Sequence, residues 1–147
     1  MLVGILMGSE SDKEVMKLTS EILGDLEIPC EVNIMSAHRT PDKVKDYASG
    51  ASERGLKVLI AGAGLAAHLA GAVAAYTILP VIGVPLAAGP LNGMDSLLST
   101  VQMPKGIPVA TVAIGSHGAR NAAYLAAQII ALENPEVAAR LKELRGW

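Results

Sequence analysis

Polar side chains that can bind an anion and move a proton follow two successive apolar runs of the chain. The two segments read Gly8-Ser9-Glu10-Ser11-Asp12 and Ser36-Ala37-His38-Arg39-Thr40-Pro41. Backbone N–H groups of a glycine-serine turn that enters a helix form an anion site, and a guanidinium such as that of Arg39 suits bidentate contact with phosphate. Asp12 can accept hydrogen bonds from ligand hydroxyls such as those of a ribose. The first segment has neither the lysine of a P-loop nor the glycine spacing of a dinucleotide fingerprint.

Each of these side chains also has a structural explanation. Ser11 or Asp12 can cap the helix that follows, and Asp12 can also stabilise the helix dipole. Arg39 can form a surface ion pair with Asp42 instead of contacting a phosphate. His38 is a candidate general acid or base because imidazole titrates near the working pH, although a lone loop histidine is more often structural. No Ser-His-Asp triad is evident in these segments.

The other two histidines and the segment Gly62-Ala63-Gly64 complete the set of candidates. His68 opens an alanine-rich helix that the composition predicts to be buried, so we expect it to have a structural or supporting role. We expect His117 at an exposed helix entry. No histidine pair has the i, i+4 spacing of a metal site and no Cys-x-x-Cys occurs, so we expect no metal. The glycines of 62–64 allow a ligand to approach closely, with tight packing as the alternative.

Composition argues against several classes of function. The 147 residues carry a net charge of −2, with no Phe, one Trp and three Tyr, so we expect neither a basic face nor an aromatic platform for nucleic acid. Residues 58–88 are rich in Ala and Gly but contain no run of about 20 apolar residues, so we expect no membrane span. The first residues predict a strand rather than a signal peptide. Cys30, the single cysteine, fits a packed thiol and a reducing cytoplasm.

Short apolar runs alternate with helix-length segments along the chain. Strands are predicted at 2–7, 30–35, 57–61, 80–84 and 108–113, and helices at 11–26, 41–54, 66–76, 95–101, 119–132 and 135–144. The alternation predicts a single α/β domain over residues 1–147, a three-layer α/β/α sandwich around a parallel, flavodoxin-like or Rossmann-like sheet of about five strands. Right-handed crossovers then bring the five loops at 8–12, 36–41, 62–68, 85–93 and 115–118 to one edge of the sheet, where ligands bind.

Local signals place some element boundaries. Thr40 or Ser36 can cap the second helix, and Pro41 suits its first turn because the missing N–H costs nothing there. Gly55 is expected to end that helix. The imperfect alternation of apolar and polar residues over 30–35 fits a strand near the sheet edge.

Several longer strings resemble those of one family. They are Met7-Gly8-Ser9-Glu10-Ser11-Asp12, Ser36-Ala37-His38-Arg39-Thr40-Pro41, Ala61-Gly62-Ala63-Gly64, Ala66-Ala67-His68-Leu69, Leu79-Pro80-Val81-Ile82-Gly83-Val84-Pro85, Leu91, Gly93, Asp95-Ser96-Leu97-Leu98-Ser99, Val101-Gln102-Met103-Pro104 and Gly106-Ile107-Pro108-Val109-Ala110-Thr111. In this order, over nearly the whole chain, they are similar to the strings of class I N5-carboxyaminoimidazole ribonucleotide mutases of purine biosynthesis.

This resemblance implies an isomerase that moves a carboxylate from the exocyclic nitrogen of an imidazole ribonucleotide to ring carbon C4, without metal, ATP or organic cofactor. It implies that the substrate loses carbon dioxide in a closed site, that C4 attacks the trapped gas, and that His38 is the catalytic residue that moves the proton. By similarity Ser9 and Asp12 bind the ribotide and Arg39 binds its phosphate. The remaining implied substrate-binding residues are Gly8, Ser36, Ala37, Gly62, Ala63, Gly64 and His68. The family also implies a cytoplasmic homo-octamer, with the Ala/Gly-rich segment between subunits.

Four sites depart from the usual family pattern. Leu65 stands where a glycine is usual, Ala70 where proline is usual, Ala88 where serine is usual, and His117-Gly118-Ala119 where the family has Ala-Gly-Ala. Leu65 adds bulk and Ala88 removes a hydroxyl on loops that we expect to line the site. Two alternatives therefore stay open: a class II aminoimidazole ribonucleotide carboxylase that takes free carbon dioxide, and a ribotide-binding homologue without turnover. Retention of His38 and Arg39 favours the mutase.

Overall fold

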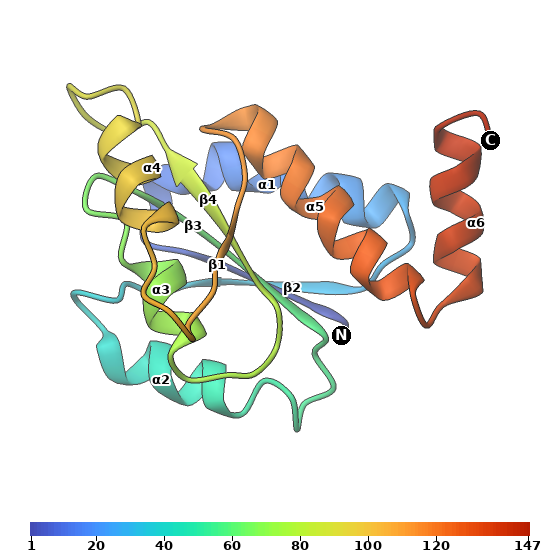
Figure 1. The fold of residues 1–147 in the computed structure, drawn as a ribbon, viewed down its shortest axis with the longest axis horizontal. Coiled ribbons are helices and arrows are strands. Elements are labelled where there is room, and N and C mark those ends of the chain that lie inside the picture. The colour runs from blue at the N-terminus through green and yellow to red at the C-terminus, as the bar shows by residue number, and fades with distance from the viewer.

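The sheet is parallel throughout, as the strand–helix alternation predicts. In the computed structural model, which describes residues 1–147, five strands pair in the order β2-β1-β3-β4-β5 (Figure 1). The strands are β1 (Val3–Met7), β2 (Cys30–Ile34), β3 (Val58–Gly64), β4 (Val81–Leu86) and β5 (Ala110–Thr111). The strand order reverses between β1 and β3, and open α/β sheets bind ligands beside such a switch point.

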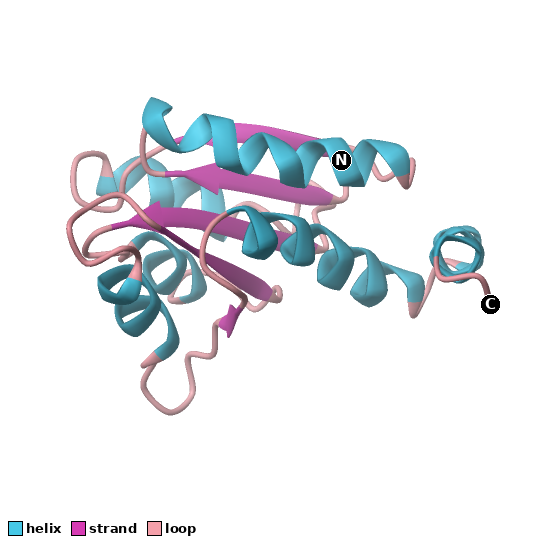
Figure 2. Cartoon of the chain, turned by 90° about the horizontal axis from the view of Figure 1, so that it is seen from above, coloured by secondary structure: helices cyan, strands magenta, loops and turns pink.

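Helices cover both faces of the sheet, which confirms the predicted three layers (Figure 2). They are α1 (Lys13–Asp25), preceded by the 3₁₀ turn η1 (Glu10–Asp12), then α2 (Pro41–Ser49), α3 (Leu69–Ala74), α4 (Met94–Val101), α5 (Ser116–Ala131) and α6 (Pro135–Leu144). One core, which includes Ile5 and Ile60, lies under α1 and α5. The other, which includes Leu6 and Leu59, lies under α2 and α3. None of the helices is both long and apolar enough to cross a membrane.

Small side chains let α1 and α5 pack closely. Five alanines of α5 have no exposed surface: Ala119, Ala122, Ala123, Ala126 and Ala127. The Thr19 hydroxyl of α1 donates to the Ala119 carbonyl at 2.8 Å, so this buried hydroxyl is paired. Dense packing of this kind holds α1, and the loop that leads into it, in a fixed position on the sheet.

The second strand lies at the sheet edge, as its imperfect alternation predicts. Val32 and Ile34 of β2 are 48% and 40% exposed at this edge. The start of the next helix also agrees with the sequence: Thr40 occupies the N-cap of α2 and Pro41 is its first residue. The expected end of that helix was wrong. α2 stops at Ser49, and the following turns close at Gly55, whose φ of +85° favours glycine.

Two other predicted elements are shorter than expected. α3 begins at Leu69 rather than at residue 66, because Leu65 adopts φ +55° and turns the chain before the helix starts. β5 contains only Ala110 and Thr111, and Pro108 before it has no N–H to extend the ladder. In contrast, β3 and β4 are longer than expected and stay paired as far as Gly64 with Leu86.

Candidate active site

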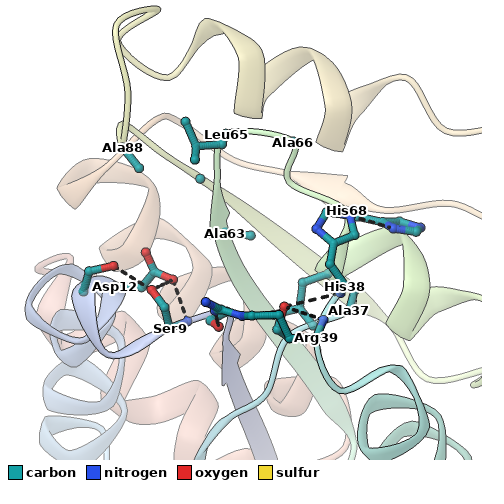
Figure 3. Close-up of a pocket in the computed structure, with 15 residues that line it drawn as sticks. Ser9, Asp12, Ala37, His38, Arg39, Ala63, Leu65, Ala66, His68 and Ala88 are labelled. Carbon is teal, nitrogen blue, oxygen red and sulfur yellow. Dashed lines mark hydrogen bonds between the residues drawn. The ribbon is translucent and has the colours of Figure 1, made fainter.

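The loops after β1, β2, β3 and β4 enclose a cavity of about 470 Å³ at the carboxyl edge of the sheet (Figure 3). Its lining consists of Gly8, Ser9, Ser11, Asp12, Ser36, Ala37, His38, Arg39, Ala63, Gly64, Leu65, Ala66, His68, Leu69 and Ala88. A volume of this size suits a small organic ligand. The fifth loop, 115–118, was expected at the same edge, but none of its residues lines the cavity; His117 is exposed, as expected.

Chemistry rather than size marks this cavity as the candidate site. A larger hollow of about 910 Å³ lies near the amino end of β4, between the end of α3 and the segment before β5. No carboxylate, imidazole or guanidinium lines that larger hollow. The 470 Å³ cavity brings all three of these groups together, in Asp12, His38 and Arg39.

The β1–α1 turn is built around a buried carboxylate. Asp12, only 8% exposed, accepts hydrogen bonds from the Ser9 backbone N–H at 3.0 Å and from the Ser9 hydroxyl at 3.1 Å. Ser9, not Ser11, occupies the N-cap of the 3₁₀ turn, and the Ser11 hydroxyl lies 2.6 Å from that of Ser9. Asp12 is the N-cap residue of α1, but its side chain makes no capping hydrogen bond there. The carboxylate therefore fixes the turn and orients two hydroxyls at the cavity wall.

Arg39 reaches across the cavity rather than out to the surface. Its Nη2 donates to the Gly8 carbonyl at 2.6 Å, and it forms no ion pair with Asp42. Figure 3 shows the side chain extending from the β2–α2 loop toward Ser9. Arg39 is exposed and lines the cavity, so its remaining N–H donors are free to bind a ligand next to the β1–α1 turn. This end of the cavity is therefore suited to an anion.

Ser36 orders the loop that carries Arg39 and His38. Its hydroxyl accepts hydrogen bonds from the backbone N–H groups of His38 at 3.3 Å and Arg39 at 3.2 Å. The Thr40 hydroxyl in turn accepts from the Ser36 N–H at 3.0 Å and donates to the Ser36 carbonyl at 3.1 Å. Ala37, between them, packs against the core under α2 and α3. These bonds order the loop from which His38 and Arg39 both line the cavity.

The two histidines of the cavity contact each other. His38 Nε2 lies 3.3 Å from His68 Nδ1, and the ring centroids are 5.2 Å apart. The expectation that His68 is buried in a helix was wrong: it is exposed, precedes α3 and faces the cavity. No three His, Cys, Asp or Glu side chains gather where they could hold a metal ion together.

The glycine-rich segment divides between two roles. Ala63 and Gly64 line the cavity, as expected of residues that allow close approach, but Gly62 does not. A Cβ on Gly62 would lie 2.3 Å from Met16 Sδ, so the absence of a side chain here leaves room for Met16 in the core. Gly62 therefore serves tight packing, which was the alternative to contact with a ligand. The Gly62 carbonyl accepts a hydrogen bond from Gly8 N–H at 3.3 Å and so supports the β1–α1 turn from behind.

Some other residues that line the cavity have side chains whose type and spacing do not indicate a binding site. Leu69 is an ordinary apolar residue at the start of α3, and Ala66 belongs to a segment that composition alone assigns to packing. A supporting residue was also missed: the Ser99 hydroxyl of α4 accepts a hydrogen bond from Ala67 N–H at 3.0 Å and donates to the Asp95 carbonyl at 2.7 Å. Ser99 belongs to one of the family strings, but only the fold brings α4 against the β3–α3 loop, so the sequence gives no sign of this supporting role.

Comparison with known proteins gives the family of the chain. The family model described as AIR carboxylase matches residues 2–146. A Bacillus subtilis protein named N5-carboxyaminoimidazole ribonucleotide mutase is 59% identical over 98% of this chain and 89% of its own length. A Thermotoga maritima protein of the same name is 57% identical over 97% of this chain and 82% of its own length.

The fold comparison gives the same result. A crystal structure of Treponema denticola PurE superposes with a TM-score of 0.87 at 32% identity, over 99% of this chain and 89% of that one. The match with the family model and the relatives above 50% identity extend over nearly the whole sequence, including every loop that lines the cavity. The chain therefore belongs to the AIR carboxylase family.

Proposed function

We propose that the chain is an N5-carboxyaminoimidazole ribonucleotide mutase of de novo purine (IMP) biosynthesis. The reaction moves a carboxylate from the exocyclic nitrogen of the imidazole ribonucleotide to ring carbon C4. The observation that carries the proposal is the position of His38, which lies in one cavity with an anion-binding end and an apolar wall. Relatives that carry this name at more than half identity support the same activity.

The polar end of the cavity would bind the ribose phosphate. Arg39 exchanges the Gly8 carbonyl for phosphate oxygens, since a charged bidentate contact is stronger than one bond to a neutral carbonyl. The hydroxyls of Ser9 and Ser11 and the buried Asp12 carboxylate bind the ribotide beside it. The backbone of Gly8, Ser36, Ala37, Ala63 and Gly64 completes the wall against which the ligand lies.

The histidine end would carry the chemistry. His38 first supplies a proton to the exocyclic nitrogen as the N–C bond of the carbamate breaks, which leaves an aminoimidazole and carbon dioxide. The electron pair at C4 then attacks the carbon of carbon dioxide, a C–C bond forms, and the C4 proton passes back to His38. One proton leaves His38 and one returns, so the cycle balances without an oxidant, a reductant or ATP.

The proposal extends to the assembly and its location. We propose a cytoplasmic homo-octamer, as in the family that the sequence resembles. An apolar stripe on α4 and the residues before it supports contact between subunits: Leu91, Met94, Leu98 and Val101 are 61%, 52%, 52% and 46% exposed and recur at the spacing of one helix face. Much of the Ala/Gly-rich segment expected between subunits lies inside the fold instead, since β3, β4 and most of α3 are buried.

Turnover of freshly prepared N5-carboxyaminoimidazole ribonucleotide tests the function. The assay contains no ATP, added metal or bicarbonate, and the C4-carboxylated product is expected at a rate proportional to enzyme. Absence of that product, with tight binding of the ribotide, would contradict the mutase. Adding bicarbonate and aminoimidazole ribonucleotide then separates the carboxylase, which forms the product, from a ribotide-binding homologue, which does not.

A further inference from the structure

The loop between β3 and α3 carries His68 to the cavity without forming regular structure. Leu65 turns the chain there with a φ of +55°, and Figure 3 shows the backbone continuing past Ala66 to His68. The His68 side chain is exposed and forms a single hydrogen bond, between its Nδ1 and His38 Nε2 at 3.3 Å. No packing around the ring fixes it, so the place of the imidazole depends on the backbone that carries it.

A hydroxyl of α4 holds this loop one residue before the histidine. Ser99 accepts a hydrogen bond from the Ala67 backbone N–H at 3.0 Å. The same hydroxyl donates to the Asp95 carbonyl at 2.7 Å, one turn earlier in α4, so the helix itself orients it. No other residue of the chain forms a side-chain hydrogen bond with the backbone of residues 65–68. Ser99 is therefore the one polar side chain that ties the loop to the rest of the fold.

The Ala67 N–H has no good alternative to Ser99. Ala67 is only 3% exposed, so water does not readily reach its backbone. Its other acceptor is the Leu65 carbonyl at 2.9 Å, a contact that spans just three residues, as in a γ-turn. A buried N–H without a sufficient acceptor is costly, so loss of the Ser99 hydroxyl favours loop conformations that turn the N–H toward water. Such conformations displace the next residue, His68.

We propose that Ser99 is a positioning residue that, through Ala67, holds His68 in hydrogen-bonding contact with His38. This inference rests on the proposed mutase function, in which His38 moves the proton. At the 3.3 Å contact one ring donates and the other accepts, so the place of His68 selects which nitrogen of His38 carries the proton. Ser99 therefore acts on proton transfer from outside the cavity, and it leaves the phosphate end of the cavity untouched.

Steady-state kinetics of Ser99→Ala give the first test. Alanine favours helix, so α4 is retained, and we expect kcat to fall about three- to five-fold with KM nearly unchanged. Ser99→Thr keeps a hydroxyl at an exposed position and should recover most of the loss. Ser20→Ala is the matched control, because the Ser20 hydroxyl also donates to a carbonyl of its own helix, that of Lys17 at 2.8 Å, but reaches no loop. It should turn over as the wild-type chain does.

A double variant shows whether Ser99 acts through His68. In a chain that already carries His68→Ala, the further change Ser99→Ala should lower kcat by less than about 1.5-fold, because no ring is left to position. A serine that only stabilised the fold, or that acted on another residue of the cavity wall, would cause the same fold-loss in both backgrounds. Equal losses in the two backgrounds would therefore overturn the inference.

Nitrogen NMR of the imidazole rings gives a readout that needs no turnover. At about pH 8.5, where free imidazole is neutral, the ¹⁵N shifts distinguish an N–H from a bare nitrogen in each ring. We expect His38 and His68 each to hold one tautomer, and Ser99→Ala to move their shifts toward the averaged values of exposed His117. Unchanged shifts would overturn the inference. Absence of product in the wild-type chain would instead contradict the mutase function, and the spectra would still decide whether Ser99 holds the two rings together.

Discussion

His38 Nε2 lies 3.3 Å from His68 Nδ1, although the two residues follow strands that are not neighbours in the sheet. β1 lies between β2, which leads to His38, and β3, which leads to His68. At this distance one ring must donate and the other accept, because a neutral imidazole has one N–H and one free nitrogen. The contact therefore couples the tautomer of the histidine that we propose for proton transfer to that of its neighbour.

Replacing His38 by asparagine should abolish turnover while leaving binding intact. The amide cannot move a proton at neutral pH, so we expect kcat to fall by about 10²- to 10⁴-fold. The dissociation constant of aminoimidazole ribonucleotide should change by less than about three-fold, because Ser9, Asp12 and Arg39 remain. Steady-state kinetics and calorimetric titration give both numbers. His117→Asn, at an exposed residue in the first turn of α5 outside the cavity, is the control, and near-normal turnover in His38→Asn would exclude His38 as the proton carrier.

Replacing His68 tests the contact between the two rings. His68→Ala removes the partner of His38 Nε2, and we expect kcat to fall by about ten-fold with KM nearly unchanged. His68→Asn should recover part of that loss, since its amide can place a polar atom near the position of the imidazole Nδ1. A residue that only packs would give similar kinetics in both variants. Equal kcat values for the two would therefore contradict a positioning role.

Arg39 should determine affinity for the phosphate. In Arg39→Met we expect binding of the ribotide to weaken about 10- to 100-fold, while binding of the dephosphorylated nucleoside stays the same. Arg39→Lys should recover only part, because an ammonium cannot form the bidentate contact. Competition titrations with the two ligands measure the difference. Arg120→Met, an exposed arginine of α5 outside the cavity, is the control; a similar loss for nucleoside and ribotide would rule out a phosphate-specific contact.

Periodicity and capping signals predicted the framework of the site well. The alternation of strands and helices gave a parallel sheet, and its connection rules placed Ser9, His38 and Ala63 at one edge although they are far apart in sequence. Thr40 and Pro41 predicted the start of α2 correctly, because helix capping and the preference of proline for the first turn depend only on neighbouring residues. Local rules of this kind do not depend on what packs against the segment.

Features that depend on tertiary contacts were not predictable in the same way. His68 was assigned to a buried helix because alanine-rich sequence favours helix, but the turn at Leu65 delays α3 and leaves His68 exposed. Gly62 looked like a ligand-contact glycine, and only the position of Met16 in the core reveals its packing role. The 115–118 loop follows β5, whose pairing is too short and too far along the sheet to bring it into the cavity.

The single cysteine should be slow to react. Burial raises the pKa of the Cys30 thiol, so less thiolate is present at a given pH than in an exposed cysteine. At pH 8 we expect a disulfide reagent such as Ellman's reagent to modify the folded chain at least about ten-fold more slowly than the chain in urea. The absorbance of the released thiolate gives both rates. Cys30→Ser is the blank, and equal rates for folded and unfolded chain would contradict the prediction.

Tyr47 should make the chain less stable at alkaline pH. Its hydroxyl donates to Glu31 Oε1 at 2.7 Å, and the Arg54 guanidinium lies 4.5 Å from its ring centroid. Burial, reinforced by the hydrogen bond and charge of Glu31, raises the pKa of Tyr47. The folded chain therefore keeps this proton at a pH where the unfolded chain releases it, so the contribution of Tyr47 is present below about pH 10 and is lost as the pH rises above it.

Comparison with Tyr47→Phe isolates this contribution. The variant loses the bond to Glu31, and we expect its free energy of unfolding to be lower by about 1 kcal/mol at pH 8. Above about pH 10 the difference should shrink, because only the wild-type chain carries the titrating phenol at this position. Urea unfolding at pH 8 and pH 10.5 measures it, and Tyr124→Phe, which lacks a contact with Glu31, is the control. A difference that stays constant between the two pH values would show that Tyr47 does not hold its proton more tightly in the folded chain.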